Sequence, residues 1–248
     1  MWGVKIMELI FEEYFENLDD WNFEHGFIRN NELQYYTPNN VELSRGLKIY
    51  GKKEQVKNES YDANSDDWRK NREYAEYTSS SINTKGKFEF QYGVLEVKAK
   101  IPTSDGSWPA IWLLGSEEQY PFCDEVDVME YYLCGDSPSI LANFMWSNNG
   151  EYNWSTKQLS LDYFKNKDAD WENKFHIWKL DWQEEYMRIY IDDELVNEIN
   201  IGNIKGNKFK KKYYILLNLA IGRKGLKPAD DNMPLIYEIE YVKVYSNI

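Results

Sequence analysis

Apolar and polar residues alternate with a period of two along much of this chain. The alternation covers residues 88–101, 176–182, 186–191 and 237–245. A period of two predicts β-strands with one buried face. Residues 213–221 form a nearly continuous apolar run, which predicts a strand buried on both faces.

Helical periodicity is scarce, and only residues 8–15 favour a short turn of helix. Residues 52–75 are polar and charged and predict a long surface loop. Many strands separated by turns favour an all-β sandwich over an α/β fold. No Pro/Gly/Ser-rich linker divides the 248 residues, so we expect one domain over residues 1–248.

The formal net charge of −13 disfavours nucleic acid, anionic lipid and anionic polymers as partners. No apolar run approaches the roughly 20 residues that span a bilayer. Aromatic residues make up 17% of the chain, with 10 Trp and 20 Tyr. They fit packing within sheets and stacking against sugar rings equally well. A neutral partner and no membrane contact are therefore expected.

Three carboxylates, Glu125, Asp127 and Glu130, lie within the otherwise apolar run 121–131. Its valines and methionine favour a partly buried strand, where carboxylates are costly unless they are paired, hydrogen-bonded or used. Glu125 and Asp127 share one face of a strand, whereas Glu130 is an odd number of residues away. A β-bulge between Asp127 and Glu130 is predicted, because it would return Glu130 to the same face.

Two carboxylates on either side of a glycosidic bond are the usual equipment for glycoside hydrolysis. A separation of about 5–5.5 Å between Glu125 and Glu130 would indicate a retaining double displacement. Asp127 lies between them, and like-charge repulsion raises the pKa of at least one of the three. A calcium site or a solvated edge strand is the alternative, although calcium ligands usually come from flexible loops.

At these residues the chain resembles glycoside hydrolase family 16, in its laminarinase-like (endo-β-1,3-glucanase) branch with the signature Glu-x-Asp-x-x-Glu. The resemblance extends over nearly the whole chain in the same order. It covers residues 29–36, 92–100, 106–115, 213–222 and 237–245. It implies a β-sandwich jelly roll, similar to concanavalin A, with a concave substrate cleft.

The resemblance also implies roles for the carboxylates. Glu125 is the nucleophile, Asp127 its electrostatic assistant and Glu130 the acid/base. The implied enzyme is endo-acting and cleaves β-1,3- or mixed-linkage β-1,3/1,4-glucan. The implied substrate-binding residues are Asn31, Glu96, Trp108, Trp112, Tyr120 and Asn218.

Five of these six binding residues, all except Tyr120, also have a structural alternative. Core packing competes for Trp108 and Trp112, and surface or strand-pairing roles compete for Asn31 and Glu96. Asn218 lies in an apolar strand and demands a hydrogen-bond partner, which favours a cleft position.

The chain departs from the family at two places. Asn143 and Met145 occupy the strand on which laminarinase-like members often carry a histidine, and Tyr120 stands where many have tryptophan. Both changes bear on the positive-side subsites and on the preferred linkage.

Many family members also bind a structural Ca²⁺ away from the cleft. Glu13, Gly46 and Glu240 stand near the corresponding places in this chain. No cofactor is expected to be required for catalysis.

Several other functions share this fold. They are hydrolysis of a red-algal galactan (agarose, porphyran or carrageenan), transglycosylation, and carbohydrate binding by a non-catalytic lectin. The −13 charge disfavours sulfated galactans, and a lectin would not require all three carboxylates. We expect a monomer. The first residues lack a signal peptide, but a polymeric substrate favours a secreted or cell-surface location.

Overall fold

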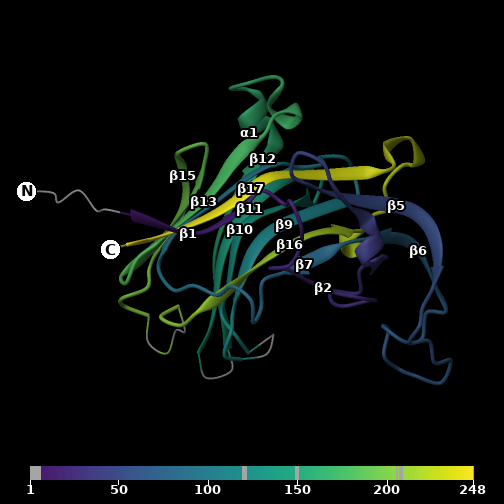
Figure 1. Ribbon diagram of the computed structural model, residues 1–248. Helices are drawn as coiled ribbons and strands as arrows, with labels where there is room; N and C mark the ends of the chain where they lie inside the picture. The colour runs from purple at the N-terminus through teal and green to yellow at the C-terminus, as the bar shows by residue number, and fades with distance from the viewer. Residues whose placement is uncertain (1–6, 119–121, 149–150, 205, 207–208, 248) are drawn as a thin grey trace, which may run out of the picture.

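The computed structural model describes all residues except 1–6, 119–121, 149–150, 205, 207–208 and 248. The described residues form two β-sheets that pack face to face (Figure 1). The all-β sandwich predicted from the alternating pattern is therefore confirmed.

The larger sheet, called the outer sheet below, has ten strands. Its main path is β15 (Glu194–Asn200), β14 (Tyr186–Ile191), β13 (His176–Trp182), β8 (Gly93–Lys100), β17 (Leu235–Asn247), β5 (Leu47–Lys57), β6 (Tyr74–Ser79) and β3 (Gln34–Tyr36). Off this path, β1 (Met7–Glu13) pairs with β17 and β4 (Val41–Leu43) pairs with β5.

The smaller sheet, called the cleft sheet below, has seven strands. Their order is β12 (Glu151–Ser160), β11 (Ser137–Asn148), β10 (Glu125–Cys134), β9 (Ser107–Gly115), β16 (Tyr213–Ile221), β7 (Ser81–Asn83) and β2 (Asn22–Phe23). The described helices are short: α1 (Leu161–Lys165), η1 (Pro38–Asn40), η2 (Trp171–Asn173), η3 (Arg223–Gly225) and η4 (Asp230–Asn232). No helix in the described part of the chain is both long and apolar enough to span a membrane.

The core lies between the two sheets and explains the sequence patterns. In β8 the buried residues Leu95, Val97 and Ala99 alternate with partly exposed ones, as expected for a strand with one face in the core. Every residue of β16 is buried, because β16 is central in the cleft sheet and both of its faces are covered. Both strand predictions are confirmed.

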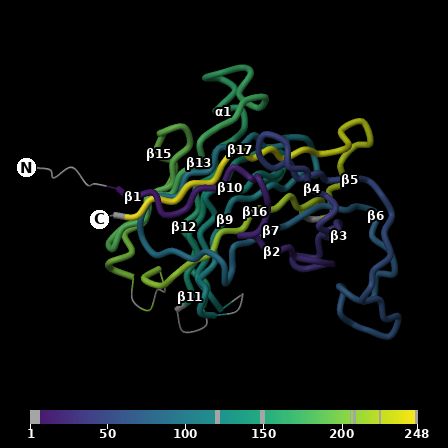
Figure 2. Tube along the Cα trace, viewed as in Figure 1, coloured from purple at the N-terminus to yellow at the C-terminus, as the bar shows by residue number. Residues whose placement is uncertain are grey.

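The prediction of a helical turn over residues 8–15 is wrong. Met7–Glu13 form β1, which lies antiparallel to the last strand, β17, with Met7 opposite Asn247 (Figure 2). The hydrogen bonds to β17 outweigh a weak local preference for helix. The loop predicted over residues 52–75 is also shorter, since β5 continues to Lys57 and β6 begins at Tyr74.

Candidate active site

Strand β10 carries the three carboxylates on the face of the cleft sheet that is turned away from the core. Asp127 lies opposite Asn143 of β11, and the register then shifts before Glu130. The two residues between the carboxylates, Val128 and Met129, are both fully buried. This is the predicted bulge, and it returns Glu130 to the face of Asp127.

Two side chains hold Glu130 by both of its oxygens. Asn143 Nδ2 donates to Glu130 Oε2 at 2.9 Å and to Asp127 Oδ2 at 3.0 Å. The indole nitrogen of Trp108 donates to Glu130 Oε1 at 3.0 Å. Asn143 therefore bridges two of the carboxylates at a place where the sequence indicated only a missing histidine.

The surroundings of Glu125 and Asp127 raise the pKa of both carboxyl groups, and the cause differs in one respect. Burial, followed by the charges of Glu125 and Glu130, raises the pKa of Asp127 well above its usual range. Burial and the charge of Glu130 also raise the pKa of Glu125, to about 7. A hydrogen bond between Asp127 and Glu125 lowers the pKa of Glu125 and raises that of Asp127. In this hydrogen bond Asp127 is therefore the donor and Glu125 the acceptor.

Glu130 is a buried carboxyl with a raised pKa. Burial raises its pKa, and this effect exceeds the opposing effects of the Trp108 hydrogen bond, the Arg223 charge and the Asn143 hydrogen bond. One face of β10 thus presents two carboxyl groups with raised pKa values, Glu125 at about 7 and Glu130 above its usual range. Acid-assisted nucleophilic displacement uses two carboxyl groups on one face, one as nucleophile and one as proton donor.

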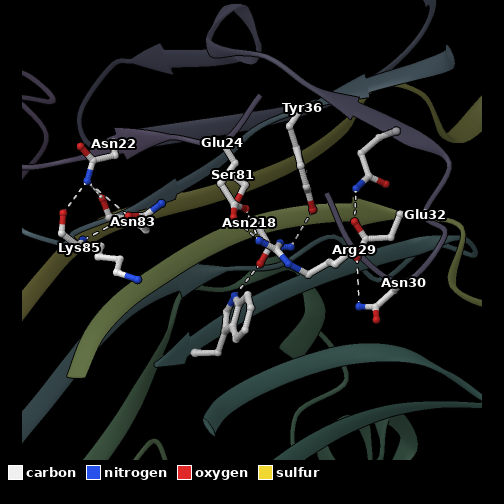
Figure 3. A network of polar contacts seen from close by, with 12 residues as sticks. Asn22, Glu24, Arg29, Asn30, Glu32, Tyr36, Ser81, Asn83, Lys85 and Asn218 are labelled. Atoms are coloured by element: carbon white, nitrogen blue, oxygen red, sulfur yellow. Dashed lines mark hydrogen bonds and ion pairs between the residues drawn. The ribbon is translucent and has the colours of Figure 1, made fainter. Parts of the chain in front are cut away.

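The pocket above the carboxylates is lined by residues from the cleft sheet and from the segment that precedes β3. Trp108, Trp112 and Asn218 all line it, as predicted. Asn218 Oδ1 accepts a hydrogen bond from Trp112 Nε1 at 2.7 Å, and Asn218 Nδ2 donates to the Tyr36 hydroxyl at 3.1 Å (Figure 3). These bonds satisfy the buried amide of Asn218, and they fix the edge of the Trp112 ring.

Arg29 and Glu32 also line the pocket, although the sequence did not single them out. The Arg29 guanidinium forms an ion pair with Glu24 and lies 5.0 Å from the centre of the Trp112 ring (Figure 3). Glu32 is 3% exposed and accepts a hydrogen bond from Gln34 Nε2 at 2.6 Å. Burial raises the pKa of Glu32 to about 7, against the lowering effect of the Arg29 charge. The sequence feature that could have indicated Arg29 and Glu32 is the presence of two charged side chains in this one short segment.

Arg223 is a further residue that the sequence did not indicate. It begins η3, separated from the end of β16 by one residue, and its guanidinium carbon lies 3.2 Å from the centre of the Tyr132 ring and 5.1 Å from that of Trp108. The charge of Glu130 acts on it, so Arg223 stands beside the acid end of the site. The preceding Gly222, at φ +86°, permits this turn, because a Cβ there would lie 2.3 Å from the side chain of Leu33.

The structure does not bring every predicted binding residue to the pocket. Asn31 accepts a hydrogen bond from Arg72, and its neighbour Asn30 lines the pocket instead. Glu96 lies on the outward face of β8 in the outer sheet, because the inward positions of that strand alternate with it. Tyr120 lies outside the described residues.

The residues suggested for calcium do not fit a cation site. Glu240 forms an ion pair with Lys98 at 2.9 Å, so an ammonium group already neutralises its carboxylate. Glu13 accepts a hydrogen bond from the indole of Trp21 at 3.3 Å. Gly46 packs against the backbone of Glu240 but adds no charge. In the described part of the chain, no group of three or more His, Cys, Asp or Glu residues is placed to hold a metal.

Comparison with known proteins agrees with this geometry. The model of the family described as Glycosyl hydrolases family 16 matches residues 36–225. The chain is 29% identical to Glucan endo-1,3-beta-glucosidase A1 of Niallia circulans, over 96% of this chain and 38% of that protein. The chain spans only 38% and 34% of the length of the first two curated relatives it matches.

Two solved structures are similar over almost their full length. One comes from work on endo-acting O-glycanases of the human gut microbiota that initiate mucin breakdown. It has a TM-score of 0.85 and 29% identity, covering 97% of this chain and 91% of that one. The other is the endo-β-1,3-glucanase of Pyrococcus furiosus, with a TM-score of 0.79 and 31% identity, covering 98% and 96%.

Proposed function

Because the chain belongs to family 16 of the glycosyl hydrolases, we propose that it is a retaining, endo-acting β-glucanase. Its substrate is a β-1,3-linked or mixed-linkage β-1,3/1,4-glucan. The observation that carries the proposal is the bulged strand β10, which brings Glu125, Asp127 and Glu130 to one face beside the pocket. The similarity to endo-β-1,3-glucanases supports the choice of glucan.

The first step forms a covalent intermediate. A carboxylate oxygen of Glu125 attacks the anomeric carbon, and the bond from that carbon to the leaving oxygen breaks. Glu130 gives its proton to the leaving oxygen, so no free alkoxide forms. Asp127 keeps Glu125 oriented through their shared hydrogen bond.

The second step releases the sugar. The Glu130 carboxylate takes a proton from water, the water oxygen attacks the anomeric carbon, and the ester bond to Glu125 breaks. Two inversions at one carbon leave the β configuration unchanged. A sugar hydroxyl in place of water would give transglycosylation by the same path.

The charge and chemistry of the chain suggest its partners and its location. A neutral β-glucan suits a chain with a net charge of −13, and nucleic acid and membranes do not. We propose that the protein acts as a monomer. It would be secreted or held at the cell surface, where polymeric glucans are found.

Hydrolysis of defined polysaccharides tests the proposal. We expect the wild type to release oligosaccharides from laminarin or barley mixed-linkage glucan, with the β configuration at the new reducing end observed by NMR. Glu125→Gln should lower kcat by at least about 10³-fold while binding persists. Glu198→Gln is the matched control, because Glu198 pairs with Arg188 at 3.1 Å on the outer sheet. Unchanged turnover by Glu125→Gln would refute the assignment.

A host O-glycan is a second candidate substrate. It is favoured by the structural similarity, at a TM-score of 0.85, to a protein from work on mucin-degrading O-glycanases. Mucin O-glycans therefore belong in the substrate panel, together with agarose and porphyran for the galactan alternative. Cleavage of the O-glycans without cleavage of either glucan would replace the glucan proposal. Binding of a glycan without any cleavage would favour a lectin.

A further inference from the structure

The edge strand of the cleft sheet, β12, carries two exposed aromatic side chains beside the site. Trp154 is 53% exposed and Tyr152 is 47% exposed. We propose that Trp154 is a sugar-stacking platform that extends the substrate cleft across β11 to the edge of the sheet. This inference rests on the proposed action on a glycan chain and adds a subsite to it.

The strand register places Trp154 in one row with the nucleophile. Glu125 lies opposite Met145 of β11, and Met145 lies opposite Trp154 of β12. Directly opposed residues of antiparallel strands project from the same face. Trp154 is therefore on the face of Glu125 and two strand spacings away, at about 10 Å.

The row formed by Glu125, Met145 and Trp154 runs across the strands in the same direction as the pocket. The pocket crosses the strands from Asn218 of β16, over Trp112 of β9, to Asp127 of β10. A glycan that follows this line past the carboxylates next meets β11 and then β12. Trp154 is thus positioned for a sugar ring beyond the scissile bond, on the far side of β10 from Trp112.

The alternation along β12 shows that Trp154 is not a core residue. Leu159, of the opposite parity, packs against the core between the sheets. Tyr152, Trp154, Thr156 and Gln158 have the other parity, and all four are exposed.

This set of side chains has the composition of a sugar subsite. A flat indole face stacks on the apolar face of a pyranose ring, and neighbouring hydroxyl and amide groups bond to its hydroxyls. A neutral sugar ring suits these uncharged side chains.

Substitution of Trp154 tests the platform, with kcat and KM measured on laminarin. We expect Trp154→Ala to raise KM about threefold to tenfold, the loss of one aromatic stacking contact, with kcat within about twofold of wild type. Trp154→Phe, which keeps a flat ring, should recover most of the affinity. Phe175→Ala is the control, because Phe175 is a 38% exposed aromatic next to β13 of the outer sheet and should leave KM unchanged.

A binding measurement separates this inference from the proposed function. The Kd of laminarihexaose is measured by calorimetry for Glu125→Gln with and without Trp154→Ala, and we expect the same threefold to tenfold weakening. An unchanged Kd and KM would overturn the platform and leave the glucanase proposal standing.

Failure of the wild type to cleave either glucan would overturn the proposed function. The same pair of variants is then compared on mucin O-glycans, where equal affinity would overturn the platform. Binding to none of these glycans would overturn both.

Discussion

At the scale of single residues, Asn143 links the electrostatics of the site. Its one amide nitrogen donates to both Asp127 and Glu130, and each bond lowers the pKa of its acceptor. The carboxyl groups of Asp127 and Glu130 are thereby held at fixed positions on either side of the bulge. A histidine at this strand is not needed to position Glu130.

We predict that Asn143→Ala lowers kcat about tenfold to 100-fold, the size expected when a buried acceptor loses its hydrogen-bond partner. The pKa of Glu130 should rise, because a group that favours its ionised form has gone. The kcat–pH profile measures both effects. An unchanged kcat with an unchanged profile would show that the bridge has no part in the reaction.

Arg223 gives a pH prediction with a defined sign. Activity should fall at low pH as Glu125, with a pKa of about 7, becomes protonated, and at high pH as Glu130 loses its proton. The Arg223 charge lowers the pKa of Glu130. Arg223→Met should therefore move the alkaline limb of the kcat–pH profile to higher pH.

Arg223→Lys is the matched control for this shift, because it keeps the positive charge while losing the planar stack on Tyr132. Its alkaline limb should stay close to that of the wild type. A shift of equal size in both variants would attribute the effect to stacking and not to charge.

At the scale of elements, the bulge in β10 is what places Glu130 on the same face as Glu125 and Asp127. Val128 and Met129 both point into the core, so Glu130 occupies the face that an unbulged strand would give to residue 129. If one of Val128 and Met129 were absent, the three carboxylates would be spaced two residues apart. They would then share one face of a regular strand without a bulge.

This leads to a prediction for deletion of Met129. The glutamate should remain on the cleft face, with kcat reduced about 100-fold by misplacement but still measurable above that of Glu130→Gln. The free energy of unfolding should fall by about 2–5 kcal/mol, because a fully buried side chain is lost.

Met129→Ala is the matched variant, since it keeps the bulge and loses most of the same buried volume. Urea unfolding and kcat for both variants separate the packing effect from the effect on the bulge. A deletion variant as inactive as Glu130→Gln would show that the bulge is required to place the acid.

At the scale of the whole molecule, no group of three or more His, Cys, Asp or Glu residues in the described part of the chain is placed to hold a metal. The pair of Lys98 and Glu240 lies on the outer sheet at the place suggested for calcium. We predict that neither EDTA nor added CaCl₂ changes the melting temperature, because a ligand stabilises a fold only by binding it. A rise in melting temperature that depends on CaCl₂ concentration would contradict this prediction.

The outcome for the binding residues shows where sequence reasoning stops. Asn218 was identifiable because a buried amide within an apolar strand needs a partner, and Trp112 supplies it. The sequence marked Asn143 only as a departure from the family, and it did not indicate Arg223, because the importance of both residues depends on which distant strand each one meets.

The sequence by itself determined the period-two strands, the three carboxylates and the need for a bulge, because these depend on local alternation and on the cost of burying charge. It could not determine that Glu96 faces outward, that residues 8–15 extend along β17, or that Trp154 shares a row with Glu125. Those outcomes depend on strand order and register, which are fixed by contacts between residues far apart in the chain. Only the tertiary structure decides them.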